Sequence, residues 1–265
     1  MWFFKRKKRR GIIALIPISG VISMKMVDPY LEIIERAEKS KKVKGVLLNL
    51  SSQGGSVTAT EVLYMALKRL AEKKPLYAWT TLAASGGYYA ACAAEKILAP
   101  PSAMVGSIGV IYIKPVISGI MKKVGIKVEI GKEGKFKDDG LFFTESTPDG
   151  KKRMAAINSE VYKGFVKVVS EERGLDKKGT EAVATGEIFT ARRGVELGLV
   201  DELTDLRGAK DKIAELTKVH SERVVTFRPR RSLLSSLVER GVSRWVGGVI
   251  RVAVEDFYRP EIYYM

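Results

Sequence analysis

Apolar residues form three nearly continuous runs in the first part of the chain, at residues 12–18, 45–50 and 76–80. Each run is short and almost uninterrupted by polar residues, which is typical of strands buried on both faces of a parallel sheet. Between the runs, apolar residues recur every three or four positions, and this spacing predicts amphipathic helices. The alternation predicts repeated βαβ units, and therefore an α/β fold with a mostly parallel sheet flanked by helices.

Two sequence signals predict where the first helices begin. Asp28 followed by Pro29 is the pattern of an N-cap residue with a proline in the first turn, and it predicts a helix to about residue 41. Thr58 and Glu61 have the spacing of a capping box, which predicts a second helix to about residue 73.

In the middle of the chain, glycine residues interrupt the apolar pattern. Residues 103–113 are strand-like, and residues 126–130 predict another strand. Residues 131–147 are polar and rich in glycine, and a loop of this length inside a compact domain is usually functional or mobile. Further helices are predicted at 147–173, 177–184 and 207–217.

Charged and amphipathic segments mark the two ends. Residues 5–10 are all Lys or Arg and follow three aromatic residues, while residues 232–257 place apolar side chains at helical spacing with most arginines elsewhere. We therefore expect a basic tail at 1–10, an α/β domain at 11–217, and an extension at 218–265 that contains an amphipathic helix.

The composition limits the classes of partner and cofactor. The formal net charge of +16 suits an anionic partner, but no RNA-binding or helix-turn-helix signature accompanies it, so we expect no nucleic acid. One Cys and one His leave no disulfide framework and no ordinary zinc site, so we expect no metal and no cofactor. Abundant Lys, Arg and Glu with little Asn and Gln is typical of proteins from hot environments.

Residues 80–95, TTLAASGGYYAACAAE, carry the main candidate for chemistry. Ser85 stands between a predicted strand end and a helical stretch of small residues, a place where a nucleophile can sit on a sharp turn. Free N–H groups at the helix start could stabilise an oxyanion, and Gly86 and Gly87 would let a substrate approach closely. The alternative is a helix of Ala and Gly that packs tightly in a core.

A serine nucleophile needs a base, and the sequence offers no convincing histidine. His220 is the only one and lies in a polar turn far along the chain. A lysine must then take the proton, although a free lysine has a pKa of about 10.4 and is charged at pH 7. Desolvation lowers the pKa of a lysine, so the loop at 131–147 would have to become buried, most simply against a neighbouring subunit.

Three motifs follow one another along the chain: ASGGYY at 84–89, GSIGVI at 106–111 and GEIFTARRGVELGLVDEL at 186–203. Their kind and order are similar to those of the signal peptide peptidase A family. From about residue 12 to residue 216 the chain resembles this family of membrane-associated Ser-Lys proteases with the ClpP/crotonase fold. The resemblance implies repeated ββα and βαβ units, a homo-oligomeric ring, and peptide substrates such as signal peptides.

The resemblance also implies roles for particular residues. Ser85 would be the nucleophile, and the amides of Gly86 and Gly55 would be the two oxyanion donors. Lys137 would be the general base, because the family's lysine lies in a loop directly before an aspartate. Lys135 is the rival for this role.

Lys132 is a weaker candidate for the base.

The chain also departs from the family's pattern. Residues 51–55 read Ser-Ser-Gln-Gly-Gly where the family often has Asn-Ser-Pro-Gly-Gly, so a proline with a fixed φ is lost. The family's N-terminal transmembrane anchor has no counterpart, so we expect residues 1–10 and 232–257 to contact an anionic membrane peripherally. The alternatives are a solvated tail at 1–10 and packing of 232–257 on a neighbouring subunit.

Three functions follow from these observations. The first is a serine endopeptidase that cleaves short, largely apolar peptides such as signal peptide remnants. The second is a crotonase-like acyl-CoA enzyme, against which the paired Ser85 and Lys137 motifs argue. The third is a non-catalytic basic protein that binds lipid or nucleic acid. A fluorophosphonate label on Ser85 would separate the first from the other two.

Overall fold

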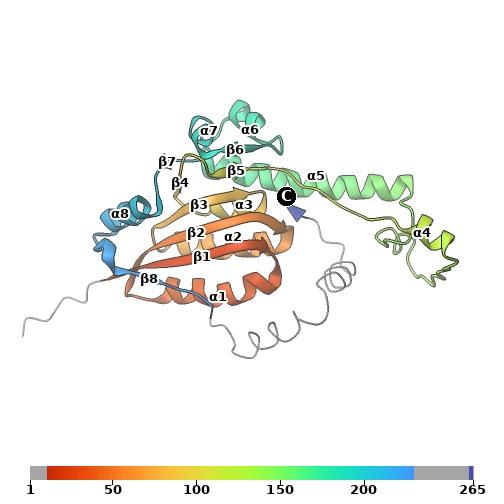
Figure 1. Cartoon of the computed structure of the whole chain (residues 1–265), viewed down its shortest axis with the longest axis horizontal. Helices are drawn as coiled ribbons and strands as arrows, with labels where there is room; N and C mark the ends of the chain where they lie inside the picture. Colours follow the sequence, from red (N-terminus) through yellow and green to blue (C-terminus); the bar gives the residue numbers. More distant parts are fainter. Residues whose placement is uncertain (1–10, 230–262, 265) are drawn as a thin grey trace, which may run out of the picture. The chain divides into compact units, whose positions relative to one another are not determined.

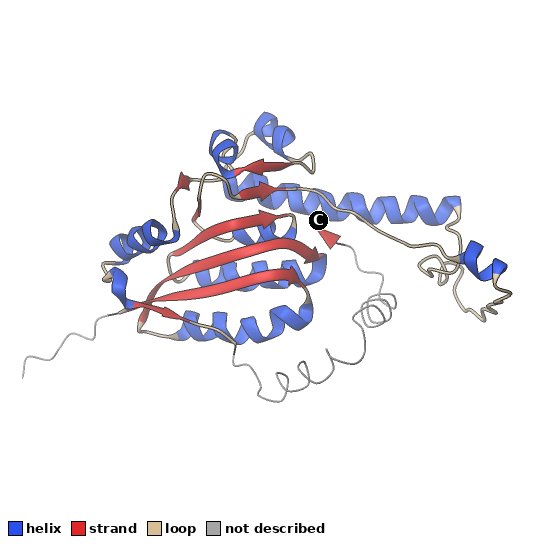
Figure 2. Cartoon of the chain, viewed as in Figure 1, coloured by secondary structure: helices blue, strands red, loops and turns tan. Residues whose placement is uncertain are grey.

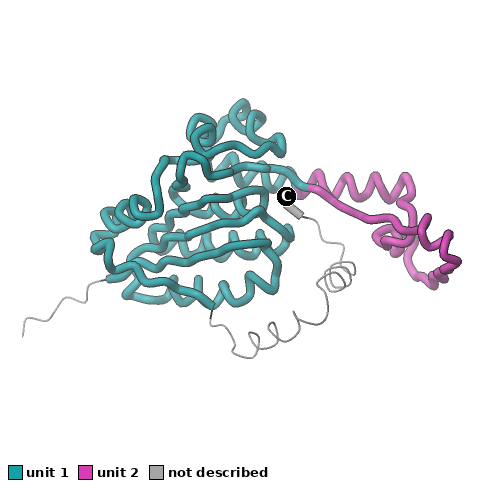
Figure 3. The backbone as a smooth tube through the Cα atoms, viewed as in Figure 1, with its two compact units in different colours: residues 1–110, 162–229, 263–265 teal, residues 111–161, 230–262 magenta. Residues whose placement is uncertain are grey.

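The computed structural model describes residues 11–229 and 263–264, which belong to two compact units (Figure 3). Among the described residues, the first unit contains 11–110, 162–229 and 263–264, and the second contains 111–161. The basic tail expected at 1–10 and the amphipathic helix expected at 232–257 lie outside the described residues.

The first unit is built on a nine-stranded sheet in which the path runs β6-β5-β3-β2-β1-β8 (Figures 1 and 2). β4 also pairs with β3, β7 with β4, and β9 with β2. All pairings are parallel except β5 with β6 and β2 with β9, so the predicted α/β fold with a mostly parallel sheet is confirmed. The strands are β1 (Ile12–Ile22), β2 (Val43–Ser56), β3 (Leu76–Ala84), β4 (Lys96–Ala99), β5 (Met104–Gly106), β6 (Ile188–Thr190), β7 (Glu202–Leu203), β8 (Val224–Thr226) and β9 (Tyr263–Tyr264).

Helices cover both faces of this sheet (Figure 2). Alternate residues of the central strands form a buried cluster with α8, among them Ile13, Leu47 and Ile213. The residues between them point to the opposite face, where α1 and α2 pack on β1 and β2. The helices of this unit are α1 (Met24–Lys39), α2 (Val57–Ala71), α3 (Gly86–Ala91), α6 (Lys177–Val183), α7 (Ala191–Glu196), α8 (Leu206–Thr217) and the 3₁₀ turn η1 (Ser221–Arg223).

Both predicted helix starts are wrong, because each helix begins nearer to the preceding strand. Ser23 caps α1, its side chain accepting a hydrogen bond from the Met26 amide at 3.4 Å, so Asp28 and Pro29 lie inside the helix. β2 runs through to Ser56, and α2 follows at the next residue, so Thr58 is already helical and forms no cap. Only α2 follows its strand without an intervening residue, and its N-cap residue Ser56 makes no side-chain capping bond.

The second unit has little regular structure apart from α4 (Ser118–Lys123) and the first part of α5 (Pro148–Arg173). The strand predicted at 126–130 is irregular, because no strand of the described part of this unit pairs with it. Of the strand-like segment at 103–113, only β5 joins the sheet. This unit leaves large apolar side chains exposed by 41–65%: Ile113, Val116, Ile120, Val124, Ile126, Val128, Ile130, Phe136 and Ile157.

Candidate active site

Ser85 occupies a sharp turn between a strand and a helix. β3 ends at Ala84, and α3 begins at Gly86. The Ser85 backbone has φ +53° and ψ −122°, and its amide donates to the Gly106 carbonyl at 2.8 Å. Positive φ is uncommon for a residue with a side chain and costs on the order of 1–3 kcal/mol, so the surrounding structure must enforce it. Such a turn is the geometry of a nucleophile elbow, in which a serine stands at the carboxyl end of a strand.

The Ser85 hydroxyl is buried, and its oxygen has no hydrogen-bond partner among the described residues. A buried hydroxyl without a partner loses its hydrogen bonds to water without replacement, which is unfavourable in a folded protein. An unpaired hydroxyl on a strained turn therefore marks a candidate functional site.

A second glycine turn lies at the end of the neighbouring strand. Ser52 donates its hydroxyl to the Gly20 carbonyl at 2.6 Å and accepts a bond from the Gly54 amide at 3.1 Å. The Gly54 amide is thereby engaged, which favours Gly55 as the oxyanion donor at this turn. Gly55 has φ +154°, and a Cβ there would lie 2.1 Å from the Ile22 carbonyl oxygen, so only glycine fits.

The two glycine segments, at the ends of successive strands, lie side by side. A Cβ on Gly86 would lie 2.5 Å from the Thr60 hydroxyl and 3.4 Å from the Gly54 Cα. A Cβ on Gly87 would lie 2.5 Å from the Ser52 carbonyl oxygen. The absence of side chains thus lets α3 pack directly against β2 and α2. Of the predicted site residues, the first unit brings together Ser85, Gly86 and Gly55.

Lys137 belongs to the second unit, in the irregular loop at 131–147. Its side chain is exposed and has no hydrogen bond or ion pair with the described residues. The two alternative candidates for the general base have other partners. Lys132 forms an ion pair with Asp138 at 2.6 Å, and the Lys135 ammonium lies 5.2 Å from the centre of the Phe136 ring. The pairing of Lys137 with Ser85 remains a prediction.

Contacts on both sides of Lys137 hold this loop. Arg153 forms an ion pair with Asp139, and its guanidinium lies 3.4 Å from the centre of the Phe136 ring. Lys114 donates to the Asp139 carbonyl at 2.8 Å and to the Ser146 hydroxyl at 3.1 Å, and burial lowers its pKa below the usual value. We did not single out Lys114 from the sequence, because nothing in its local pattern shows that it is partly buried.

His220 is remote from the Ser85 turn. It precedes β8, whose Val224 pairs with Ile13 near the start of β1, whereas Ser85 follows the end of β3. The imidazole is exposed, with Nδ1 3.6 Å from the Glu222 carboxylate. The inference that this histidine is not the base is consistent with that position.

Buried contacts behind Ser85 fix α3 in place. The Tyr88 hydroxyl donates to the Leu199 carbonyl at 2.9 Å, and the Tyr89 ring packs edge-on against the Tyr64 ring with their centres 5.0 Å apart. Burial raises the pKa of Cys92 to about 12, so this thiol stays protonated and unreactive. The turn is therefore supported by a rigid layer.

An ion pair in the same layer ties α5 to the sheet. Arg173, with only 6% of its side chain exposed, lies 2.9 Å from the Asp201 carboxylate and also donates to the Gly198 carbonyl at 2.9 Å. Asp201 accepts a further bond from the Ile97 amide at 2.7 Å.

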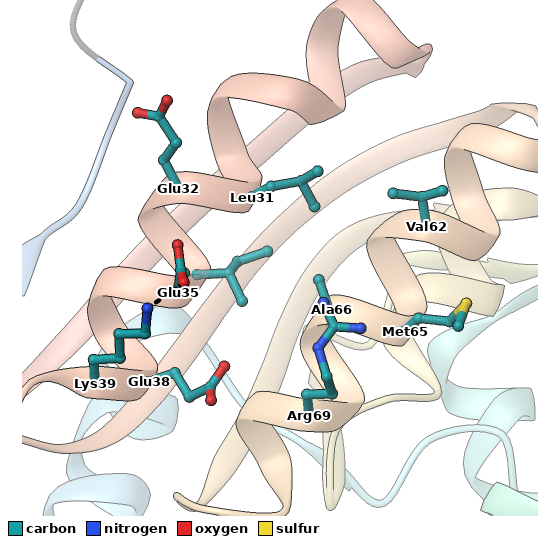
Figure 4. Close-up of a pocket in the computed structure, with 10 residues that line it drawn as sticks. Leu31, Glu32, Glu35, Glu38, Lys39, Val62, Met65, Ala66 and Arg69 are labelled. Carbon is teal, nitrogen blue, oxygen red and sulfur yellow. Dashed lines mark hydrogen bonds and ion pairs between the residues drawn. The ribbon is translucent and has the colours of Figure 1, made fainter.

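A groove of about 500 Å³ lies between α1 and α2 (Figure 4). Its lining includes Leu31, Val62 and Met65, and glutamates of α1 stand along one side. Neither Ser85 nor the two glycine turns line it, so it is distinct from the candidate active site.

Neither a metal-binding cluster nor a membrane-spanning helix occurs among the described residues. No group of three or more His, Cys, Asp or Glu side chains could hold a metal ion in that part of the chain. Within residues 11–229 and 263–264, no helix is both long enough and apolar enough to cross a bilayer.

Three relatives with similar sequences are proteases by name. The sequence model of Peptidase family S49 matches residues 68–220. The chain is 37% identical over 199 residues to "Putative protease MJ0651" of Methanocaldococcus jannaschii, covering 75% of this chain and 64% of that protein. It is 32% identical over 225 residues to "Putative protease slr0021" of Synechocystis, covering 84% and 80%, and 28% identical to "Putative signal peptide peptidase SppA" of Enterococcus faecium, covering 89% and 70%.

Solved structures share the fold. A serine-to-alanine mutant of the 1510-N membrane-bound stomatin-specific protease superimposes with a TM-score of 0.52 at 17% identity, covering 83% of this chain and 99% of that one. A lysine-to-alanine mutant of the same protease in complex with a substrate peptide gives the same score and identity, covering 88% and 99%. At this identity the similarity establishes the fold alone.

Proposed function

This chain belongs to peptidase family S49, and we propose on that basis that it is a serine endopeptidase with Ser85 as nucleophile and Lys137 as general base. The observation that carries the proposal is the Ser85 turn, with its positive φ and its buried, unpaired hydroxyl beside a second glycine turn. A residue is held in such a conformation only where the surrounding structure enforces it, and such positions cluster at active sites.

The proposed chemistry uses the groups gathered at this turn. The Ser85 oxygen attacks the carbonyl carbon of the scissile peptide while the base takes its proton. The amides of Gly86 and Gly55 donate to the oxyanion that forms, and removing one such donor typically costs about 100- to 1000-fold in rate. The protonated base then gives its proton to the leaving amine, and water completes the hydrolysis of the acyl-enzyme.

A lysine can accept the serine proton only in its neutral form, so the site must exclude water around it. Lys137 is exposed in a single chain, and the unit that carries it also exposes large apolar side chains, Ile120 and Val124 among them. A second copy of the chain that packs on this unit would bury both Lys137 and these apolar side chains. We therefore propose that the active form is a homo-oligomer, most simply a ring.

The proposed substrates are short, largely apolar peptides such as signal peptide remnants. One relative is named as a signal peptide peptidase, and the resemblance of the motifs points the same way. We also propose peripheral contact with an anionic membrane through the basic residues at 5–10, because each Lys or Arg near such a surface contributes about 1 kcal/mol.

The test is turnover of a fluorogenic peptide panel together with fluorophosphonate labelling. Ser85→Ala should abolish both turnover and labelling. Lys137→Ala should abolish turnover, while Lys135→Ala, the matched control in the same loop, should retain most of it. If Lys135→Ala is inactive and Lys137→Ala is active, the base is wrongly assigned. Turnover by Ser85→Ala above about a tenth of the wild-type rate would remove Ser85 from its role.

The origin of the base is tested by mixing inactive chains. If Ser85 and Lys137 act across a subunit contact, mixed oligomers of Ser85→Ala and Lys137→Ala chains should regain part of the activity. An active monomer in sedimentation, with no recovery on mixing, would contradict the proposed oligomer.

Membrane contact is tested by sedimentation with anionic liposomes at low salt. Deletion of residues 1–10 should weaken binding, and 0.5 M salt, chosen as about three times physiological ionic strength, should weaken it further. A full-length chain that stays in the supernatant would rule out the contact.

A further inference from the structure

The groove between α1 and α2 is an apolar surface that stays open among the described residues. Leu31 of α1 and Val62 of α2 line it, together with Met65, which is 57% exposed. Large apolar side chains gathered in an open groove mark a surface that binds a partner. The proposed reaction does not use this surface, because Ser85 is not among its lining residues.

The α1 side of the groove is acidic. Glu32, Glu35 and Glu38 stand along it at a spacing of three residues, whereas the basic residues of the lining are Lys39 and Arg69 (Figure 4). Glu32 forms no ion pair with any described residue. Glu35 and Glu38 each pair with an exposed lysine, and such pairs contribute little to stability. In a chain with a net charge of +16, this acidic row is a local exception, and it suits a ligand that is both apolar and basic.

One segment of this chain has both of these properties. Residues 230–251 contain five arginines and a single acidic residue, Glu239. On a helix, Arg240, Arg244 and Arg251 would share one side, because they are four and seven residues apart. Beside that row, helical spacing places an apolar stripe of Leu234, Leu237, Trp245, Val249 and Val252.

The described residues on either side of this segment lie beside the two helices of the groove. Before it, the ring of Phe227 has its centre 4.8 Å from the guanidinium carbon of Arg36, on α1. After it, Tyr263 pairs with Ser56, the residue directly before α2. The chain therefore leaves beside α1 and returns at the start of α2. A helix over residues 232–257 would be about 39 Å long at 1.5 Å per residue, which is ample for the groove.

We propose that residues 232–257 form an amphipathic helix that docks in the α1–α2 groove of its own chain. Its apolar stripe covers Leu31, Val62 and Met65, and its arginines face the glutamates of α1. Apolar burial supplies the free energy of docking, and the opposite charges fix the orientation of the helix. Because the helix is tethered to the groove, docking does not depend on protein concentration. This inference does not rest on the proposed peptidase function.

Thiol labelling tests whether the groove is covered in the full chain. Cys92 is the only cysteine, and burial raises its pKa to about 12, so it stays unreactive. A Met65→Cys variant therefore carries one reactive thiol, in the groove. Without lipid, it should react with a chromogenic thiol reagent at least about tenfold more slowly than the same variant with Leu237→Asp and Trp245→Asp added. That factor corresponds to a groove that is open at most about one tenth of the time. Equal rates would overturn the inference.

Leu216→Cys is the matched control for these labelling rates. Leu216 is 48% exposed on α8, which packs on the opposite face of the sheet from the groove. Its labelling rate should not change when Leu237→Asp and Trp245→Asp are added. Faster labelling there as well would mean that the two aspartates loosen the whole chain, and it would overturn the inference.

A charge exchange tests the orientation of the docked helix. In the Met65→Cys chain, Arg240→Glu with Arg244→Glu should speed labelling, because glutamates would then face glutamates. Adding Glu32→Arg and Glu35→Arg should slow it again, since opposite charges are restored across the groove. A first pair of substitutions without effect, or a second pair that restores no protection, would overturn the proposed arrangement.

Mixing distinguishes docking within one chain from docking onto a second copy. The Met65→Cys chain that carries Leu237→Asp and Trp245→Asp is refolded from urea with an excess of chains that retain Met65 and an intact segment. Docking within one chain predicts that the thiol stays reactive, because each intact segment occupies its own groove. Recovered protection would assign the groove to the segment of a second copy and would overturn the inference.

Discussion

The ion pair between Arg173, whose side chain is 6% exposed, and Asp201 allows a stability prediction that depends only on the described contacts. Replacing Arg173 by methionine keeps an unbranched side chain of similar length but removes two interactions. These are the 2.9 Å contact with the Asp201 carboxylate and the 2.9 Å hydrogen bond to the Gly198 carbonyl. The carboxylate is left without its cation in a partly buried position.

Removing one partner of a fully buried pair costs about 3–5 kcal/mol. Arg173 meets that condition, with 6% of its side chain exposed, but Asp201 is 28% exposed and keeps its bond from the Ile97 amide. Water and this remaining donor compensate part of the loss. We therefore expect Arg173→Met to lower the free energy of unfolding by about 2–3 kcal/mol.

Urea unfolding followed by tryptophan fluorescence measures this loss, because urea does not screen charges. For a slope of about 2–3 kcal/mol per M, the midpoint should fall by about 1 M. The matched control is Arg193→Met, whose partner Glu196 lies on an exposed surface, with 58% and 60% of the two side chains exposed. Exposed pairs contribute little, so the control should unfold near the parent midpoint. Equal shifts for the two variants would refute the reasoning.

Three further predictions concern single residues. Gly55→Ala should lower kcat/KM more than about 100-fold, comparable to losing an oxyanion donor, because its Cβ would lie 2.1 Å from the Ile22 carbonyl oxygen; activity within threefold of the parent would contradict this. Cys92, with its pKa raised to about 12 by burial, should not react with a thiol reagent at pH 8 until urea unfolds the chain, and rapid labelling of the native protein would contradict its burial. His220→Ala should leave the rate of peptide cleavage unchanged, whereas a loss of more than about tenfold in kcat/KM would implicate the imidazole in catalysis.

The parts of the fold that the sequence predicts are those with a long apolar signal. β1, β2 and β3 each contain one of the three apolar runs, and their buried faces make the signal almost continuous. The segment at 126–130 alternates apolar and charged residues, as a strand often does, but it forms no strand, because a strand also needs a neighbour to pair with. That neighbour depends on tertiary arrangement, which a local pattern does not contain.

For the candidate site too, the sequence predicts the local motifs but not the contacts between distant segments. The Gly-rich segments at the end of β2 and just after β3 are visible as motifs, and parallel pairing of those strands brings them together. The φ of Ser85, the engagement of the Gly54 amide and the role of Lys114 were not predictable, because each depends on contacts between distant segments. β9 has only two residues, too few to show any periodicity.

The positive φ of Ser85 has a cost: serine is the residue that the proposed reaction needs, but it is not the residue that is most stable in this backbone conformation. Glycine adopts φ +53° without the energetic penalty that a side chain brings. In a related protein that is no longer selected for catalysis, we therefore expect glycine to replace this serine. Ser85→Gly should raise the melting temperature by a few degrees more than Ser85→Ala, the equivalent of about 1 kcal/mol, because both variants remove the unpaired hydroxyl but alanine retains a Cβ. Glycine at this position in a related sequence would then identify a member that has kept the fold and abandoned the reaction.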